Sequence, residues 1–190
     1  VPLLEKIGLI GRLLGKALPR TQLLPAPPAE PARPAAVVLH PFLMALGAST
    51  GGPRAVADVL ADLPSDCGAA TVIVQHVDRH FAPGLAHWLG EQSGRSVELA
   101  QEGARLRPGD VLLAGTDDHL VIAPDLTLRY RPEPRECPYR PSVDEFFKSA
   151  AVSWPSPGAA ALLTGMGRDG ARGLLALRRA RWATVAEAQE

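Results

Sequence analysis

Short apolar runs that alternate with helical patterns constrain the fold of this 190-residue chain more than any other feature. The apolar runs occupy residues 43–47, 71–75, 111–115 and 159–164, and the helical patterns occupy residues 53–63, 81–92 and 171–180. Such alternation is typical of α/β proteins, in which helices cover both faces of a parallel sheet. The sequence therefore predicts an α/β fold with an open, mainly parallel, doubly wound sheet, a three-layer arrangement of the Rossmann-like kind.

The middle of the chain is richer in strand-forming residues. Runs at 119–123 and 126–130 flank a turn that contains proline, so we expect an antiparallel hairpin added to the sheet. Ser142 and Glu145 form a capping box, which predicts the start of a helix. A last strand is expected at 183–187.

Residues 1–41 differ in composition from the rest of the chain. Residues 1–18 place apolar side chains on one helical stripe, which predicts a short amphipathic helix. Seven prolines between Pro19 and Pro41 predict an extended, semi-rigid interdomain linker. We therefore expect a helix and a linker over 1–41 and one globular domain over 42–190. Since a linker joins two domains, we also expect a longer parent protein.

The charge pattern and the hydropathy exclude two classes of protein. Twenty basic residues balance twenty acidic residues with no clustered basic stretch, which argues against a nucleic-acid partner. No run of about 18 uncharged apolar residues is present, so no transmembrane segment is expected.

The cysteines and histidines indicate the cellular compartment and whether a metal site is expected. Cys67 and Cys137 lie far apart and outside any C-x-x-C motif, which predicts free thiols in a reducing compartment and hence a cytoplasmic protein. His76, Asp78 and His80 share one short segment, with no cysteine or second histidine cluster to converge on them. We therefore expect no metal site.

The stretch Gly47–Gly51 fits G-x-S-x-G, the nucleophile elbow, in which a sharp strand-to-helix turn exposes the serine hydroxyl. Ser49 would then lie beyond the carboxyl end of the first strand, at the edge where open parallel sheets bind ligands. A glycine-rich turn at this place is also compatible with phosphate binding or with a plain connection. No Gly-Lys-Ser/Thr sequence follows, which excludes a Walker A loop.

His76 is the best-placed candidate base for Ser49. It directly follows the apolar run 71–75, and adjacent strands lie about 5 Å apart at the sheet edge. The other histidines lie in the linker (His40), near the second helix (His80, His87) or at the start of the hairpin (His119). The candidate acids are Asp169, in the loop after 159–164, and with weaker support Asp78, Asp117 and Asp118.

A second glycine pattern raises the alternative of a nucleotide cofactor. Gly165, Gly167 and Gly170 fit G-x-G-x-x-G, the dinucleotide-binding fingerprint, and Glu187 and Glu190 lie near the distance expected for an acid that binds ribose. A dinucleotide-binding oxidoreductase is therefore one alternative, although the rest of a nucleotide domain does not follow.

Four sequence blocks in a fixed order together resemble one family. The blocks are LGASTGGP (46–53), VIVQHV (72–77), RPSVDEFFKSAA (140–151) and LLTGMGRDGARGL (162–174). They resemble the catalytic domain of CheB-type chemotaxis protein-glutamate methylesterases over residues 43–189. Four blocks in the right order are far more specific than a single G-x-S-x-G motif.

The resemblance implies a serine hydrolase whose nucleophile, general base and orienting acid are Ser49, His76 and Asp169. Met166 matches the family position that helps to form the oxyanion hole, Thr50 matches a residue that lines the site, and Gly165 is expected beside them. The implied substrate is a methylated glutamate in the cytoplasmic region of a chemoreceptor, and the products are glutamate and methanol. Some members also deamidate glutamines, and no cofactor is implied. A catalytically idle receptor-docking module is the other alternative.

The resemblance also bears on the two ends of the chain. Family members usually carry an N-terminal receiver domain, joined to the esterase by a linker such as 1–41. Family domains also continue through one further strand and helix, so we expect 42–190 to be a C-terminally truncated catalytic domain. Val77 follows His76 at a position where members of the family commonly have methionine.

Overall fold

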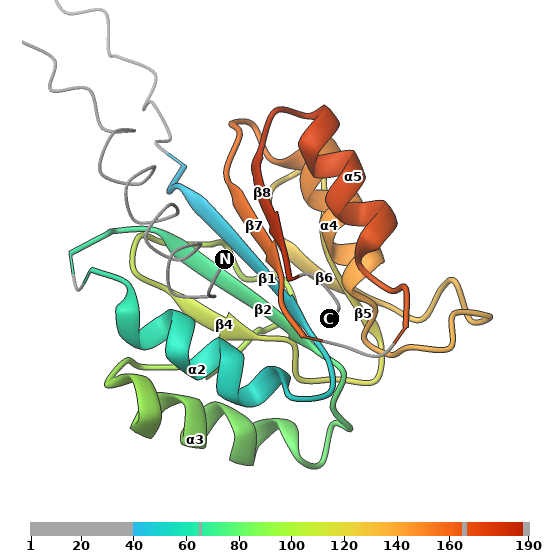
Figure 1. Cartoon of the computed structure of the whole chain (residues 1–190). Helices are drawn as coiled ribbons and strands as arrows, with labels where there is room; N and C mark the ends of the chain where they lie inside the picture. The colour runs from blue at the N-terminus through green and yellow to red at the C-terminus, as the bar shows by residue number, and fades with distance from the viewer. Residues whose placement is uncertain (1–39, 65, 165–166, 188–190) are drawn as a thin grey trace, which may run out of the picture.

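The computed structural model describes residues 40–64, 66–164 and 167–187, which form a sheet covered by helices on both faces (Figure 1). The sheet has six strands in the order β3-β4-β2-β1-β7-β8, and every pair is parallel. The strands are β1 (Leu43–Ala48), β2 (Ala70–Gln75), β3 (Glu98–Leu99), β4 (Val111–Leu113), β7 (Ala159–Leu162) and β8 (Ala183–Ala186). The predicted open, parallel, doubly wound sheet is confirmed. The predicted helix at 1–18 and most of the linker lie outside the described residues.

Two hydrophobic cores, one on each face of the sheet, explain the uninterrupted apolar runs. Every residue of β1 and β2 is buried. Along β1, Met44 and Leu46 belong to the core on one face, whereas Leu43 and Ala45 belong to the core on the other. Because successive side chains of a strand point to opposite faces, a strand that is covered on both sides must be apolar at each position.

Among the described residues, four helices cover the sheet, two on each face (Figure 1). They are α2 (Gly52–Asp62) and α3 (Ala82–Ser93) on one face, and α4 (Val143–Ser153) and α5 (Ala171–Arg179) on the other. The predicted helix start is confirmed at Val143, and Ser142 is its N-cap, because its hydroxyl accepts the Glu145 N–H at 3.3 Å. The reciprocal bond of a capping box is not formed, since the Ser142 N–H donates to His119 Nδ1 and the Glu145 carboxylate bonds Lys148. No helix among the described residues has the length and apolar content needed to cross a bilayer.

The predicted hairpin forms a separate two-stranded sheet of β5 (His119–Ile122) and β6 (Leu128–Arg131). The second strand begins two residues later than predicted, because residues 123–127 form the turn. There the Asp125 carboxylate accepts both the N–H and the hydroxyl of Thr127, and Leu126 adopts a positive φ of 65°.

Candidate active site

The carboxyl ends of β1, β2 and β7 meet at one edge of the sheet, and their register brings the candidate residues together. Ala48, the last residue of β1, pairs with Gln75, the last residue of β2, so Ser49 and His76 leave neighbouring strands side by side. β7 pairs with the other side of β1, and the loop that follows it carries Asp169. The His76 N–H donates to the Ala48 carbonyl at 3.2 Å, which extends the pairing by one residue.

Ser49 lies on a sharp turn between β1 and α2. Its carbonyl accepts the Gly52 N–H at 2.8 Å, and its own N–H donates to the Thr164 carbonyl at 3.0 Å. Gly51 has a φ of 77°, a left-handed conformation that favours glycine. A Cβ atom at Gly52 would overlap the Gln75 side chain. The glycines after Ser49 are therefore needed for the turn that a nucleophile elbow requires.

Ser49, His76 and Asp169 form a hydrogen-bonded series. The Ser49 Oγ lies 3.0 Å from His76 Nδ1, and His76 Nε2 lies 2.7 Å from Asp169 Oδ2. Because an ionised carboxylate can only accept, the hydrogen of a neutral His76 is on Nε2 and the Nδ1 lone pair faces the serine hydroxyl. The ring is mostly buried, with 14% of the His76 side chain exposed against 5% for Asp169.

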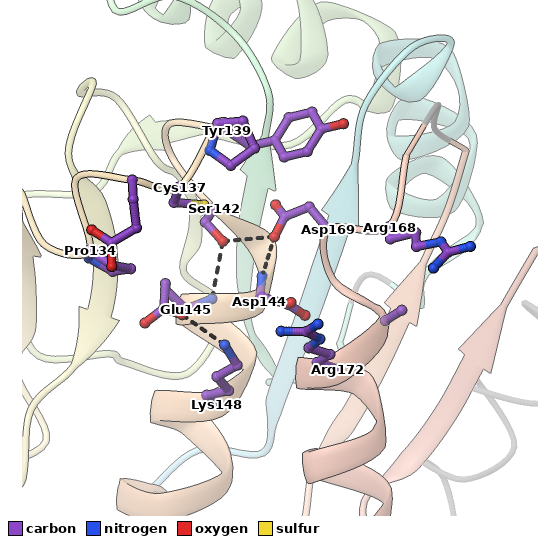
Figure 2. Close-up of a pocket in the computed structure, with 13 residues that line it drawn as sticks. Pro134, Cys137, Tyr139, Ser142, Asp144, Glu145, Lys148, Arg168, Asp169 and Arg172 are labelled. Carbon is purple, nitrogen blue, oxygen red and sulfur yellow. Dashed lines mark hydrogen bonds and ion pairs between the residues drawn. The ribbon is translucent and has the colours of Figure 1, made fainter.

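Asp169 lies at the N-terminus of α4, where four donors meet its carboxylate. Figure 2 shows the bonds from Ser142 and Asp144. Ser142 Oγ–H donates to Oδ1 at 2.7 Å, the Val143 N–H to Oδ2 at 2.7 Å and the Asp144 N–H to Oδ1 at 3.2 Å. Burial raises the pKa of Asp169, but the hydrogen bonds from His76, Ser142 and the two backbone groups outweigh it. The net pKa lies below the ordinary value of 3.8, so the group is ionised at neutral pH.

Comparison with known proteins identifies the family of the chain. Residues 44–190 match the family model described as CheB methylesterase. The chain belongs to the CheB methylesterase family. It is 51% identical over 185 residues to a protein of Burkholderia orbicola (strain AU 1054) named protein-glutamate methylesterase/protein-glutamine glutaminase 2, which covers 97% of this chain and 53% of that protein.

Two further relatives extend the comparison. A protein of Pseudomonas savastanoi pv. phaseolicola, named protein-glutamate methylesterase/protein-glutamine glutaminase 3, is 46% identical over 99% of this chain and 54% of its own length. The chain thus spans about half the length of these curated relatives. The crystal structure of the Thermotoga maritima CheB methylesterase catalytic domain superposes with a TM-score of 0.73 at 32% identity, over 80% of this chain and 82% of that one.

Tyr139 is a site residue of this CheB-family chain that the sequence patterns did not reveal. Its ring stacks on His76 with centroids 4.5 Å apart and an interplanar angle of 13°. The contact restrains the imidazole plane between its two hydrogen-bond partners. Tyr139 lies in the irregular stretch before α4, where no periodic pattern predicts the direction of a side chain.

Gln75 is a second residue that sequence reasoning missed. It is 4% exposed, and its Nε2 donates to the Ser49 carbonyl at 2.9 Å and to the His76 carbonyl at 3.3 Å. One side chain therefore joins the backbones of the serine and the histidine. The available signal was its place in the sequence, since it is the polar end of an otherwise apolar run.

The other candidate acids do not join the series. Asp78 bonds to His80 at 2.7 Å, Asp117 pairs with Arg79 at 3.4 Å, and Asp118 lies 4.0 Å from Arg140. In the described part of the chain, no group of three or more His, Cys, Asp or Glu side chains is arranged to hold a metal ion.

The predicted site lining consists of Thr50, Gly165 and Met166. Thr50 is exposed directly beside Ser49, whereas Gly165 and Met166 lie outside the described residues.

Gly167 and Gly170, which fit the dinucleotide pattern, both have positive φ, at 113° and 94°. A Cβ atom at Gly167 would overlap the Tyr139 hydroxyl, and one at Gly170 would meet neighbouring core side chains. These glycines therefore shape the loop that carries Asp169.

A cavity of about 470 Å³ opens beside Asp169 (Figure 2). Tyr139, Ser142 and Asp169 contribute to its wall, together with Arg168 and Arg172 from the loop and the start of α5. The cavity adjoins the acid and the stacked tyrosine, whereas Ser49 and His76 are not among its lining residues.

Proposed function

We propose that this chain hydrolyses the methyl esters of glutamate side chains in chemoreceptors and releases methanol. The observation that carries the proposal is the series Ser49–His76–Asp169 at the carboxyl edge of the sheet, in a chain of the CheB methylesterase family. The names of the relatives supply the substrate class, because they are called protein-glutamate methylesterases.

The first half-reaction forms an acyl-enzyme. Ser49 Oγ attacks the ester carbonyl carbon while its proton passes to His76 Nδ1, which lies 3.0 Å away. Asp169 stays ionised and stabilises the imidazolium through Nε2–H. The tetrahedral intermediate then breaks its bond to the methoxy oxygen, which takes the proton from Nδ1 and leaves as methanol.

The second half-reaction releases glutamate. A water molecule gives a proton to His76 Nδ1 and attacks the acyl carbon, and Ser49 recovers its proton when the new intermediate collapses. An amide substrate follows the same route with ammonia as the leaving group. Deamidation of receptor glutamines is therefore part of the proposal, in keeping with the glutaminase named in the relatives.

The oxyanion that forms in each step needs backbone donors. The Ser49 N–H is engaged by the Thr164 carbonyl, which leaves the N–H of Thr50, two residues before α2, as the donor from the elbow. The positive end of the α2 dipole adds to it. Met166 is the proposed second donor, from the loop after β7. A single such donor contributes about 2.7–4 kcal/mol to the stabilisation of the transition state.

The setting in the cell follows from the same proposal. The substrate would be the cytoplasmic region of a methylated receptor, which places the chain in the cytoplasm. Residues 1–41 would link the catalytic domain at 42–190 to a receiver domain that regulates it.

Methanol release from methylated receptor membranes tests the proposal, with Ser49→Ala as the central variant. The variant lacks the nucleophile, so its rate should fall by a factor on the order of 10³ or more. The control is Ser93→Ala, because Ser93 lies at the end of α3 and its hydroxyl donates to the Leu89 carbonyl. A fluorophosphonate probe should label Ser49 in the unchanged chain. Near-parental turnover by Ser49→Ala would refute the mechanism, and an unlabelled Ser49 without methanol release would indicate an idle docking module.

A further inference from the structure

His119 is a buried, titratable side chain that the proposed mechanism does not use. It lies at the start of β5 and is 0% exposed. Its Nε2 lies 3.2 Å from the Pro134 carbonyl, and its Nδ1 lies 3.1 Å from the Ser142 backbone nitrogen. Because a carbonyl only accepts and a backbone N–H only donates, Nε2 carries the hydrogen and Nδ1 is the acceptor. With this pair of bonds His119 fixes the Ser142 backbone.

Ser142 connects this histidine to the acid of the site. Its hydroxyl accepts the Glu145 N–H at 3.3 Å as the cap of α4, and it lies 2.7 Å from Asp169 Oδ1. The hydroxyl has a single hydrogen, and neither the Glu145 N–H nor another donor can receive it. That hydrogen therefore points to the Asp169 carboxylate.

We infer that Ser142, held in place by His119, is a positioning residue that aims the Asp169 carboxylate at His76. The inference rests on the proposed function. It extends the series to His119–Ser142–Asp169–His76–Ser49, in which the direction of each hydrogen bond follows from the groups that it joins. The Ser142 hydroxyl occupies Oδ1 and so presents Oδ2 to the imidazole.

Loss of this hydroxyl has two consequences for the site. The carboxylate loses one of the contacts that set its rotation, so a smaller fraction of molecules holds His76 with Nδ1 towards Ser49. The remaining donors also neutralise less of the negative charge of Asp169, which favours protonation of the imidazole. A protonated His76 cannot accept the serine proton, so the acid limb of the rate profile should move to higher pH.

The test compares Ser142→Ala with Ser149→Ala in the full 190-residue chain. Both serines belong to α4 or its cap, and both hydroxyls are hydrogen-bonded. Ser149, however, lies about 10 Å further along the helix, where it donates to the Phe146 carbonyl and accepts the Ile122 N–H. Ser149→Ala therefore also removes a hydrogen-bonded hydroxyl from the same helix, but it leaves the contacts of Asp169 unchanged. Thermal melts establish the folded fraction of each variant.

The readouts are the rate of Ser49 labelling by a fluorophosphonate and kcat/KM for methanol release, each measured from pH 5 to 9. Ser142→Ala should lower both rates about tenfold, the effect of losing one hydrogen bond to a charged group, and should move the acid midpoint to higher pH. Ser149→Ala should leave the midpoint where it is. The same midpoint in Ser142→Ala and the unchanged chain would overturn the inference.

A pair of changes at His119 extends the test. His119→Gln offers an acceptor and a donor of similar reach, whereas His119→Leu offers neither. The Gln variant should therefore label Ser49 faster than the Leu variant, and equal rates would argue against a role for His119. If the unchanged chain neither labels nor releases methanol, the proposed function fails together with the inference. If it does both and only the midpoint shift is missing, the inference alone fails.

Discussion

At Gln75, one buried amide joins the backbones of two residues that must keep a fixed separation. Its Nε2 contacts the carbonyls of Ser49 and His76, while its Oε1 has no hydrogen-bond partner among the described residues. The amide nitrogen therefore has hydrogen-bond partners in the described structure, whereas the buried amide oxygen has none. This arrangement favours a role in positioning over a role in stability.

Replacement of Gln75 by Leu should therefore reduce activity more than stability. The change removes two donated hydrogen bonds but also an unpaired buried oxygen, so the free energy of unfolding should fall by only about 1 kcal/mol. A small displacement of Ser49 relative to His76 should slow Ser49 labelling at least about tenfold. Denaturant unfolding and labelling rates check both values, with Gln92→Leu on the exposed face of α3 as the control. A variant that labels at the parental rate would contradict the assignment.

The site residues divide into those that sequence reasoning could reach and those that it could not. Ser49 and His76 each follow an apolar run directly, and Asp169 lies in the loop after another. The strand-end rule for parallel sheets therefore places all three at one edge. Tyr139 and Ser142 reach the site from an irregular stretch and a helix cap. Their directions depend on how α4 packs against the sheet, which no local pattern encodes.

At the scale of elements, the hairpin shows how a small sheet is fixed to a larger one. Tyr130 of β6 donates its hydroxyl to the Ala100 carbonyl at 3.0 Å and accepts the Gly115 N–H at 2.9 Å. These two backbone groups follow β3 and β4 in the main sheet. Burial raises the pKa of the Tyr130 hydroxyl, so it stays protonated and able to donate.

Tyr130→Phe should loosen this attachment. The ring is retained, but the Ala100 carbonyl and the Gly115 N–H each lose a partner, so the free energy of unfolding should fall by about 1–3 kcal/mol. Urea unfolding followed by circular dichroism measures the change, and hydrogen exchange should show faster exchange of the Gly115 amide. Unchanged stability together with an unchanged Gly115 exchange rate would show that the hydroxyl does not anchor the hairpin.

Strand β3 shows why some elements escape sequence analysis. It has two residues, of which Glu98 is exposed and Leu99 is half-buried, so it carries no apolar run. It is a strand because it pairs with β4. The longer elements were predicted to within a few residues because burial on both faces, or on one helical face, marks them in the sequence.

For the whole molecule, the catalytic edge and the stability are linked through Asp169. Its carboxylate joins the loop after β7 to the start of α4 and to His76 after β2, so three segments that are distant in sequence depend on its ionised form. The folded-state pKa of Asp169 is lowered from the ordinary 3.8. The unfolded chain therefore binds more protons than the folded chain in the interval between the two values.

The contribution of Asp169 to the free energy of unfolding decreases in acid. The stabilisation from Asp169 is fully present above the unfolded pKa, and it is lost as the pH falls through the lower folded value. Asp78, Glu102 and Asp125 also have lowered pKa values, through hydrogen bonds at exposed positions. The stability curve of the unchanged chain therefore combines several carboxylates, and a difference curve is needed to isolate Asp169.

Asp169→Asn supplies that difference. The variant should be less stable than the unchanged chain at pH 6, because an amide accepts more weakly than a carboxylate at the N-terminus of a helix. The gap between the two unfolding free energies should narrow as the pH falls below about 4, since protonation removes the same charge from the unchanged chain. Urea unfolding at half-unit steps from pH 6 to pH 2.5 measures this gap. A gap that stays constant over the whole range would mean that the charge of Asp169 does not support the fold.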